Sequence, residues 1–387
     1  MTSTPTDPAD ADFRALQEIH DAALRALPAE VAGYLESGAG TEQTLRANRE
    51  AFARWVIKPR PMSGVTAPDM STEVLGIPLA TPVLTAPFGG DGLFAPDGHL
   101  AVARANAACG TASIVPEVGT FSYAEVAAAA PAAARIGQLH PYDSFDSVAK
   151  RIHAAGYSAL CVTVDCAAMG FRVRSRMNRF RPDRAVWGGN VVHDGTPNIS
   201  ETYGNRIIQG WTWDQLAEAA ARQDLPWIAK GILTREAAEA ALGAGASAIL
   251  VSNHGGRQVD PAAASLDALP EIAETVAGRV PILLDSGVRT GADVFLALAL
   301  GADAVVIGRL AAYGLAAAGE HGVRRTIELL TEELRTLMIL SGTPDIPSLS
   351  RATVAPRQAS PVIPPRRALG DLGTENYVSG RITARKA

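Results

Sequence analysis

A (β/α)8 barrel is the fold class that this 387-residue sequence predicts, and two observations lead to it. Short β-branched or apolar runs alternate eight times with alanine-rich segments of helical period, an alternation typical of parallel α/β folds. Several of the runs are apolar throughout, as expected of strands that are covered on both faces. A doubly wound open sheet is the competing interpretation, and eight sustained repeats favour a closed barrel.

The elements follow in regular order along the chain. The expected strands are Pro82–Ala86, Thr111–Val115, Ala134–Leu139, Ala159–Val164, Trp227–Lys230, Ala248–Ser252, Pro281–Asp285 and Ala304–Ile307. The helical segments between and after them are Leu100–Ala108, Phe145–Ala155, Thr212–Arg222, Arg235–Leu242, Leu266–Val276, Gly291–Leu300 and Glu320–Leu340. Two helices are expected ahead of the barrel, Asp12–Leu27 and Ala29–Glu36, the first closed by a proline and the second by a glycine-rich run.

Three regions make up the expected organisation. An N-terminal arm and helix occupy 1–28, one barrel domain occupies 29–342, and a Pro/Arg/Ser-rich arm occupies 343–387. Arg174 to Gln209, between strands four and five, has no clear period. This insertion is either a lid over the catalytic face or a disordered loop, and the sequence leaves both interpretations open.

Bulk properties exclude several classes of protein. Hydrophobic residues make up 47% of the chain and charged residues 19%, a globular composition, and the net charge of −5 argues against a nucleic-acid partner. No apolar run reaches the roughly 18 residues that span a bilayer, and the polar N-terminus does not resemble a secretory signal, so we expect a cytoplasmic protein without a membrane partner. Cys109, Cys161 and Cys166 lie in apolar stretches and are expected to be buried free thiols, with no metal site.

Polar residues gather where the expected strands end. In such barrels the carboxyl ends of the strands carry the functional groups, and the glycines after strands seven and eight would let backbone amides approach a phosphate. Each residue alone could be a core amide, a helix cap or a turn, but their coincidence with so many strand ends indicates a site. They are Gln138, Thr163, Asp165, Lys230, Ser252 to Arg257, Asp285 to Arg289, Gly308 and Arg309.

His254 is the natural general base of this set, because imidazole titrates near neutral pH and Asp165 could stabilise its protonated form. Lys230 would place a fixed cation where it can offset negative charge that develops during the reaction. Arg172 and Arg257 could clamp a substrate carboxylate, although either arginine taken singly could be a surface ion pair.

Several motifs resemble the FMN-dependent 2-hydroxy-acid oxidases and dehydrogenases, a family that includes glycolate oxidase, lactate oxidase and monooxygenase, and mandelate dehydrogenase. The resemblance runs from about Ala29 to Gly342, and its most specific motif is VSNHGGRQ. The motifs stand in the family's order: YLESGA (Tyr34–Ala39), APFGG (Ala86–Gly90), VTVD (Val162–Asp165), AKGIL (Ala229–Leu233), VSNHGGRQ (Val251–Gln258), LLDSGVRTGADV (Leu283–Val294) and ALALGADAVVIGR (Ala297–Arg309).

The resemblance implies a role for each matching residue. His254, Asp165 and Lys230 would be catalytic, and Tyr34, His140, Arg172 and Arg257 would bind the substrate. The implied FMN contacts are Pro87, Phe88, Gly89, Gln138, Thr163, Lys230, Ser252, Asp285, Ser286, Gly287, Val288, Arg289, Gly308 and Arg309. The implied activity is oxidation of a 2-hydroxy acid to the 2-keto acid, with oxygen or another acceptor reoxidising the flavin, in a homotetramer or octamer.

The sequence departs from the family pattern at four positions near the expected substrate and flavin. His140 stands where the family has tyrosine, Pro116 where it has serine or threonine, Val118 where an aromatic is common, and Gly89 where alanine is usual. We expect His140 and Val118 to open space for a larger or more polar 2-hydroxy acid, and Gly89 to change oxygen access and product retention. The glycine resembles the lactate monooxygenase pattern, which makes oxidative decarboxylation an alternative. A flavin-dependent isomerase and a catalytically degraded binding protein are further alternatives, and the substrate side chain and electron acceptor stay open.

Overall fold

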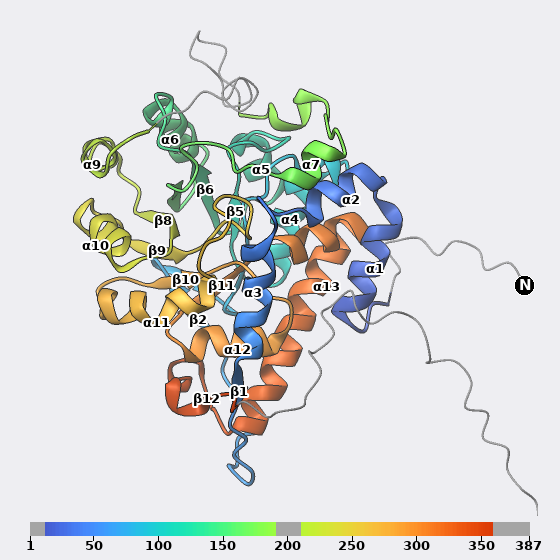
Figure 1. Cartoon of the computed structure of the whole chain (residues 1–387), viewed down its shortest axis with the longest axis vertical. Coiled ribbons are helices and arrows are strands. Elements are labelled where there is room, and N and C mark those ends of the chain that lie inside the picture. The colour runs from blue at the N-terminus through green and yellow to red at the C-terminus, as the bar shows by residue number, and fades with distance from the viewer. Residues whose placement is uncertain (1–11, 191–209, 359–387) are drawn as a thin grey trace, which may run out of the picture.

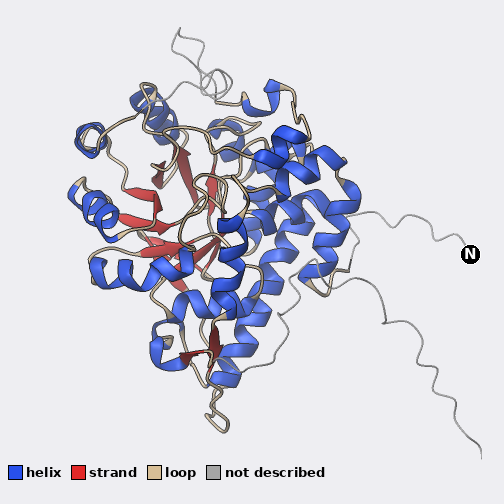
Figure 2. Cartoon of the chain, viewed as in Figure 1, coloured by secondary structure: helices blue, strands red, loops and turns tan. Residues whose placement is uncertain are grey.

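Eight parallel strands form a closed barrel in the computed structural model, which describes residues 12–190 and 210–358. Figure 2 shows the strands at the centre and the helices around them. The predicted barrel is thereby confirmed and the open sheet is wrong. In barrel order the strands are β4 (Val83–Thr85), β5 (Ser113–Val115), β6 (Arg135–Leu139), β7 (Ala159–Thr163), β8 (Trp227–Ile232), β9 (Ala248–Val251), β10 (Ile282–Leu284) and β11 (Ala304–Ile307).

Alternating side chains of each strand serve two different cores. Along β7, Ala159 and Cys161 belong to the apolar cluster inside the barrel, whereas Leu160 and Val162 pack into the cluster shared with the helices. Both faces are therefore buried, and all five residues of β7 are inaccessible. This double burial is the physical reason that the strand sequences are apolar throughout.

The helices lie on the outside of the barrel (Figure 1). The predicted ones are present as α1 (Leu16–Ala26), α2 (Ala29–Glu36), α4 (Gly98–Ala108), α6 (Phe145–Ala154), α9 (Trp213–Ala220), α10 (Arg235–Gly243), α11 (Ser265–Val276), α12 (Gly291–Ala299) and α13 (Arg309–Ser341). The helix α13 begins earlier than predicted, directly after β11, and non-helical backbone at Ala318 and Gly319 divides it. Sequence analysis missed α3 (Gln43–Ala53) and α5 (Tyr123–Ala129), although Ser122 and Glu125 form a capping box that marks the start of α5.

The two ends of the described chain pack on the barrel. The helix α1 lies against α13 (Figure 1), and β1 (Trp55–Ile57) pairs antiparallel with β12 (Val354–Pro356). The first part of the segment expected as a C-terminal arm is therefore held by a strand ladder. A separate small hairpin joins β2 (Thr72–Val74) to β3 (Ile77–Leu79). Within the described chain, no helix combines the length and apolarity needed to cross a bilayer.

The insertion after β7 contains two short helices, α7 (Val173–Met177) and the 3-10 helix η3 (Arg184–Trp187). The rest of the expected lid, 191–209, lies outside the described residues. The helix α7 rests on α2, because the hydroxyl oxygens of Ser37 and Ser175 are 2.8 Å apart and the rings of Tyr34 and Phe180 stack with centroids 4.5 Å apart. The first part of the insertion therefore lies beside the expected substrate tyrosine.

Candidate active site

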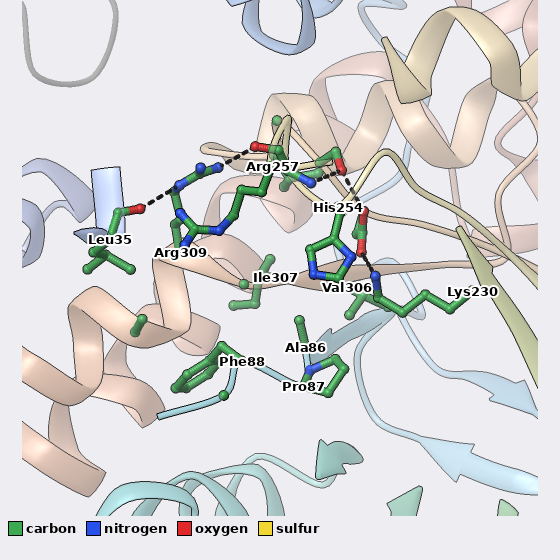
Figure 3. A pocket seen from close by; sticks show the side chains of 18 of the residues that line it. Leu35, Ala86, Pro87, Phe88, Lys230, His254, Arg257, Val306, Ile307 and Arg309 are labelled. Atoms are coloured by element: carbon green, nitrogen blue, oxygen red, sulfur yellow. Dashed lines mark hydrogen bonds and ion pairs between the residues drawn. The ribbon is translucent and has the colours of Figure 1, made fainter. Parts of the chain in front are cut away.

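A cavity lies among the segments that follow the barrel strands (Figure 3). Its walls come from α2 and from the ends of β4, β8, β9, β10 and β11. Most of the residues expected to bind cofactor or substrate line it, so the strand ends predicted from sequence do converge. The lining includes Tyr34, Pro87, Phe88, Gly89, Lys230, His254, Arg257, Asp285, Ser286, Gly287, Val288, Arg289, Gly308 and Arg309.

His254 and Asp165 form a hydrogen-bonded pair at this cavity. Nδ1 of His254 lies 3.2 Å from each carboxylate oxygen of Asp165, which itself does not line the cavity. The imidazole projects into the cavity near Lys230 (Figure 3). Because Asp165 holds the proton on Nδ1, Nε2 carries the lone pair that can accept a proton.

The backbone around His254 turns sharply, and hydrogen bonds to α3 stabilise the turn. His254 has a left-handed conformation (φ 59°) and precedes two glycines with positive φ, so the chain turns sharply at the end of β9. The amides of Asn48 and Asn253 form reciprocal hydrogen bonds of 2.9 and 2.7 Å, which fix this turn on α3. The missed helix α3 therefore helps to position the base.

The charges of the pair suit a base at neutral pH. Burial alone would raise the pKa of Asp165, but His254 and Lys230 outweigh it and hold that pKa at about 2. Burial lowers the pKa of His254, with a further contribution from Lys230, while Asp165 opposes the shift. The carboxylate is therefore ionised and the imidazole is neutral, ready to take up a proton.

Lys230 is a buried cation at the inner side of the cavity. Its Nζ lies 3.5 Å from Oδ2 of Asp285 and 3.2 Å from the hydroxyl of Ser252. Burial alone would lower its pKa, but Asp285 and Asp165 raise it above the ordinary value. The ammonium group therefore stays charged at neutral pH and could offset negative charge that develops beside it.

Of the residues expected to bind the substrate carboxylate, Arg257 and Tyr34 lie together at the cavity beside His254. The Arg257 guanidinium lies 4.7 Å above the Tyr34 ring and donates to the carbonyl oxygens of Tyr34 and Ser37. Burial and the nearby Arg172 lower the pKa of Arg257 to about 9. The guanidinium groups of Arg257 and Arg172 both remain protonated at neutral pH and repel each other. A substrate carboxylate would offset this repulsion.

The same two arginines affect the pKa of the Tyr34 phenol. Burial raises the pKa of its phenol, but Arg257 and Arg172 outweigh burial and leave the pKa below its ordinary value. Arg172 does not line the cavity, and its Nε donates to the carbonyl oxygen of Arg257 at 3.3 Å. Arg172 therefore stands behind Arg257 in this arrangement.

The far end of the cavity holds two more arginines. Arg309 donates to the carbonyl oxygens of Leu35, Ser37 and Gly255, so its side chain ties α2 to the turn after β9 (Figure 3). Arg289 lies over the Tyr313 ring at 6.0 Å and donates to a carbonyl oxygen of its own turn. This end is electropositive and glycine-rich, which suits a phosphate group.

Three expected cofactor residues stand behind the cavity wall instead of lining it. The side-chain amide of Gln138 donates to the Thr163 hydroxyl at 3.0 Å and accepts from the backbone of Glu117 at 3.1 Å. The Ser252 hydroxyl accepts from Lys230 and from the backbone of His254. In this structure these side chains therefore hold the catalytic loops together.

His140, expected to bind substrate, belongs to a second histidine–carboxylate pair. Oε2 of Glu117 accepts from the backbone of His140 at 2.9 Å and lies 2.8 Å from its Nδ1. Both side chains are 4% exposed, and the His140 ring stacks on Tyr142. Sequence analysis did not single out Glu117, although it follows Pro116 directly at the end of β5.

The space expected beside Gly89 is filled. A Cβ atom on Gly89 would lie 2.6 Å from Cγ2 and 2.9 Å from the carbonyl oxygen of Val118. Gly89 therefore leaves no free volume for a methyl group, because Val118 packs into the space that an alanine side chain would need.

Two cysteines confirm the prediction and one corrects it. Cys161 and Cys166 are buried free thiols, but Cys109 is only partly buried. Cys166 also contacts the His254–Asp165 pair, since its Sγ lies 3.5 Å from Oδ1 of Asp165 and 3.6 Å from Nδ1 of His254. Its position directly after Asp165 in the sequence could have indicated that it lies near the catalytic pair.

Comparison with known proteins identifies the family. The family model described as FMN-dependent dehydrogenase matches residues 23–356. The chain belongs to this family. A peroxisomal (S)-2-hydroxyacid oxidase of Arabidopsis thaliana is 39% identical to this FMN-dependent dehydrogenase over 344 residues, covering 87% of the chain and 94% of the relative. An L-lactate oxidase of Lysinibacillus sphaericus is 40% identical over 352 residues, covering 87% and 91%.

Solved structures agree with this placement. The lactate oxidase of Pediococcus acidilactici superposes with a TM-score of 0.84 at 37% identity, covering 90% of the chain and 96% of the neighbour. A mandelate oxidase bound to 3,3-difluoro-2-hydroxy-3-phenylpropionic acid superposes with a TM-score of 0.81 at 35% identity, covering 90% and 100%. The resemblance inferred from the motifs is thereby confirmed.

The residues present fit FMN, the cofactor of the family. A buried ammonium group at one end of the cavity suits the electron-accepting ring, and the glycines and Arg289 at the other end suit the phosphate. When bound, FMN accepts the two electrons that leave the substrate. This FMN-dependent dehydrogenase is therefore an enzyme that oxidises 2-hydroxy acids to 2-keto acids, with His254 beside the cofactor cavity.

Proposed function

We propose that the enzyme oxidises a 2-hydroxy acid larger or more polar than glycolate, with oxygen as the electron acceptor. The observation that carries the proposal is the grouping of His254, Lys230 and Arg257 around one cavity. The base, the cation and the carboxylate clamp are the three groups that this oxidation needs from the protein. The oxidase names of the relatives support oxygen as the acceptor.

The protein's part in the reaction is binding, orientation and proton transfer. Arg257 and Tyr34 bind the substrate carboxylate, which places the carbinol carbon beside Nε2 of His254. Nε2 takes the proton released on oxidation, and Asp165 stabilises the imidazolium through Nδ1. Lys230 would offset the negative charge that FMN carries once it is reduced.

The Glu117–His140 pair is our reason for a polar substrate, although neither residue lines the cavity itself. Glu117 fixes the His140 ring through Nδ1, and the Tyr142 hydroxyl donates to the carbonyl oxygen of Cys166, beside Asp165. The pair is therefore linked to the catalytic pair through Tyr142, which stacks on His140, and Cys166. An imidazole fixed in this way recognises a hydrogen-bonding group better than a methyl group.

Oxidative decarboxylation is the second candidate, and the structure gives it less support. Its motivation was Gly89, but Val118 fills the adjacent volume, so the glycine does not create extra room for oxygen or for a retained keto acid. An isomerase would not require Arg257 beside Tyr34, and a degraded binding protein would not require the ordered His254–Asp165 pair.

The test is anaerobic flavin reduction by a panel of 2-hydroxy acids, with product analysis in air. We expect rapid bleaching, keto acid and hydrogen peroxide, with polar or bulky acids ahead of glycolate. In His140→Tyr the ranking is expected to move toward small apolar acids, while the exposed His153→Tyr serves as a matched control. Failure of every 2-hydroxy acid to bleach the flavin would reject the proposed reaction, and an unchanged ranking in His140→Tyr would reject the role of His140.

A further inference from the structure

Three potential metal ligands lie close together: Sγ of Cys166, Oδ1 of Asp165 and Nδ1 of His254. Sγ of Cys166 lies 3.6 Å from this nitrogen and 3.5 Å from Oδ1 of Asp165, and Nδ1 lies 3.2 Å from the same oxygen. Among the residues that the structure describes, this is the group of histidine, cysteine and acidic side chains whose ligand atoms come within metal-binding reach. Its atoms form a nearly equilateral triangle.

The triangle has the dimensions of one face of a tetrahedral zinc site. Zinc binds sulfur at about 2.3 Å and nitrogen or carboxylate oxygen at about 2.0–2.2 Å, so tetrahedral ligand atoms lie roughly 3.3–3.6 Å apart. The three observed separations fall close to this range without movement of the backbone. Thiolate and imidazole also favour Zn²⁺ over hard cations such as Mg²⁺.

We propose that Asp165, Cys166 and His254 form an inhibitory binding site for Zn²⁺. On binding, the metal replaces the proton on Sγ of Cys166, which passes to solvent. His254 changes tautomer, because its proton leaves Nδ1 for solvent and Nε2 takes one up from solvent, so one proton is released in all. The thiolate and the carboxylate then supply two negative charges against the dication. Lys230 and Arg172 are the nearby cations that oppose it, so the site is weaker than a structural zinc site.

The position of the metal determines the kind of inhibition. A neutral imidazole that is bound to metal through Nδ1 carries its single proton on Nε2, which can then no longer act as a base. Arg257 and Tyr34 are not ligands, so the substrate carboxylate still binds. Zn²⁺ should therefore lower the limiting rate of flavin reduction and leave the apparent affinity for the hydroxy acid unchanged.

The kinetic test uses the FMN-loaded enzyme after treatment with a chelator, titrated with zinc chloride or magnesium chloride. Each variant is compared with its own rate without metal. Cys166→Ala is expected to raise the zinc inhibition constant at least about tenfold, since even loss of a residue outside the ligand shell costs that much in metal affinity. Cys166→Ser keeps the volume and should also weaken inhibition, whereas Cys109→Ala, at a thiol elsewhere, should not. Magnesium should have no effect.

A binding measurement separates this proposal from the oxidation chemistry on which its kinetic part rests. Equilibrium dialysis of the FMN-loaded protein should find one zinc ion per chain, and that ion should be lost in Cys166→Ala and retained in Cys109→Ala. This readout holds even if His254 is not the base. Equal zinc binding in wild type and Cys166→Ala, inhibition that is competitive with the hydroxy acid, or no inhibition by zinc would each overturn the proposal.

Discussion

The side-chain amide of Gln258 donates a hydrogen bond of 2.7 Å to the backbone carbonyl oxygen of Asp165. Gln258 belongs to the turn that carries His254, and Asp165 follows β7 on another part of the barrel. The bond therefore ties the loop of the base to the loop of its carboxylate partner, so the geometry of the pair is built into the backbone and does not depend on the side chains alone.

Replacing His254 by alanine should leave FMN bound and slow anaerobic flavin reduction. We expect a loss of about 10²–10⁴-fold, which is typical of removing a general base. Stopped-flow absorbance of the flavin measures the rate, and the exposed His153→Ala is the matched control. A reduction rate equal to that of the wild type would exclude His254 as the base.

The pH profile should report the lowered pKa of His254. The base works only when neutral, so kcat/KM falls as the pH drops through this pKa, and the midpoint should lie below the ordinary histidine value of about 6.5. Asp165→Asn removes the carboxylate that opposes the shift, so the midpoint should move to lower pH and the maximal rate should fall. A midpoint that moves upward in Asp165→Asn would contradict the assigned electrostatics.

Arg257→Lys should raise KM for the hydroxy acid more than it lowers kcat. An ammonium group keeps the charge but loses the planar fork that binds a carboxylate through two parallel hydrogen bonds. Steady-state kinetics with the best substrate measures both constants. Arg235→Lys, at an exposed arginine paired with Glu271, is the control and should behave like the wild type. An unchanged KM in Arg257→Lys would remove Arg257 from the clamp.

Gly89→Ala should destabilise the protein, because its methyl group would overlap Val118. Overpacking of this kind costs about 1–3 kcal/mol of the free energy of unfolding. Val118→Ala should restore part of the loss by removing the nearer contact, while the carbonyl oxygen remains in place. Thermal unfolding measures the effect, with Gly243→Ala as the control, since a methyl group there meets no neighbour within 4 Å. Equal melting temperatures for Gly89→Ala and wild type would show that the pocket has room.

Much of the barrel and of its site could be predicted from the sequence. Strands buried on both faces require apolar runs, and the helix period between them is local, so the eight repeats are visible without a structure. His254, Lys230 and Arg257 were found because they follow such runs. The helix α3 was missed because its role is to hold Asn253 through Asn48, a contact between residues more than 200 positions apart.

Only the tertiary structure decided how the less familiar residues are used. The sequence places Cys166 after Asp165 and Glu117 after Pro116, but it does not show that one meets His254 and the other His140. Likewise, the sequence does not show that Gly89 and Val118 pack against each other and leave no volume for a methyl group. The physical reason is that local patterns determine where a strand ends, whereas the direction of each side chain and the atoms that fill the remaining volume depend on closure of the whole barrel.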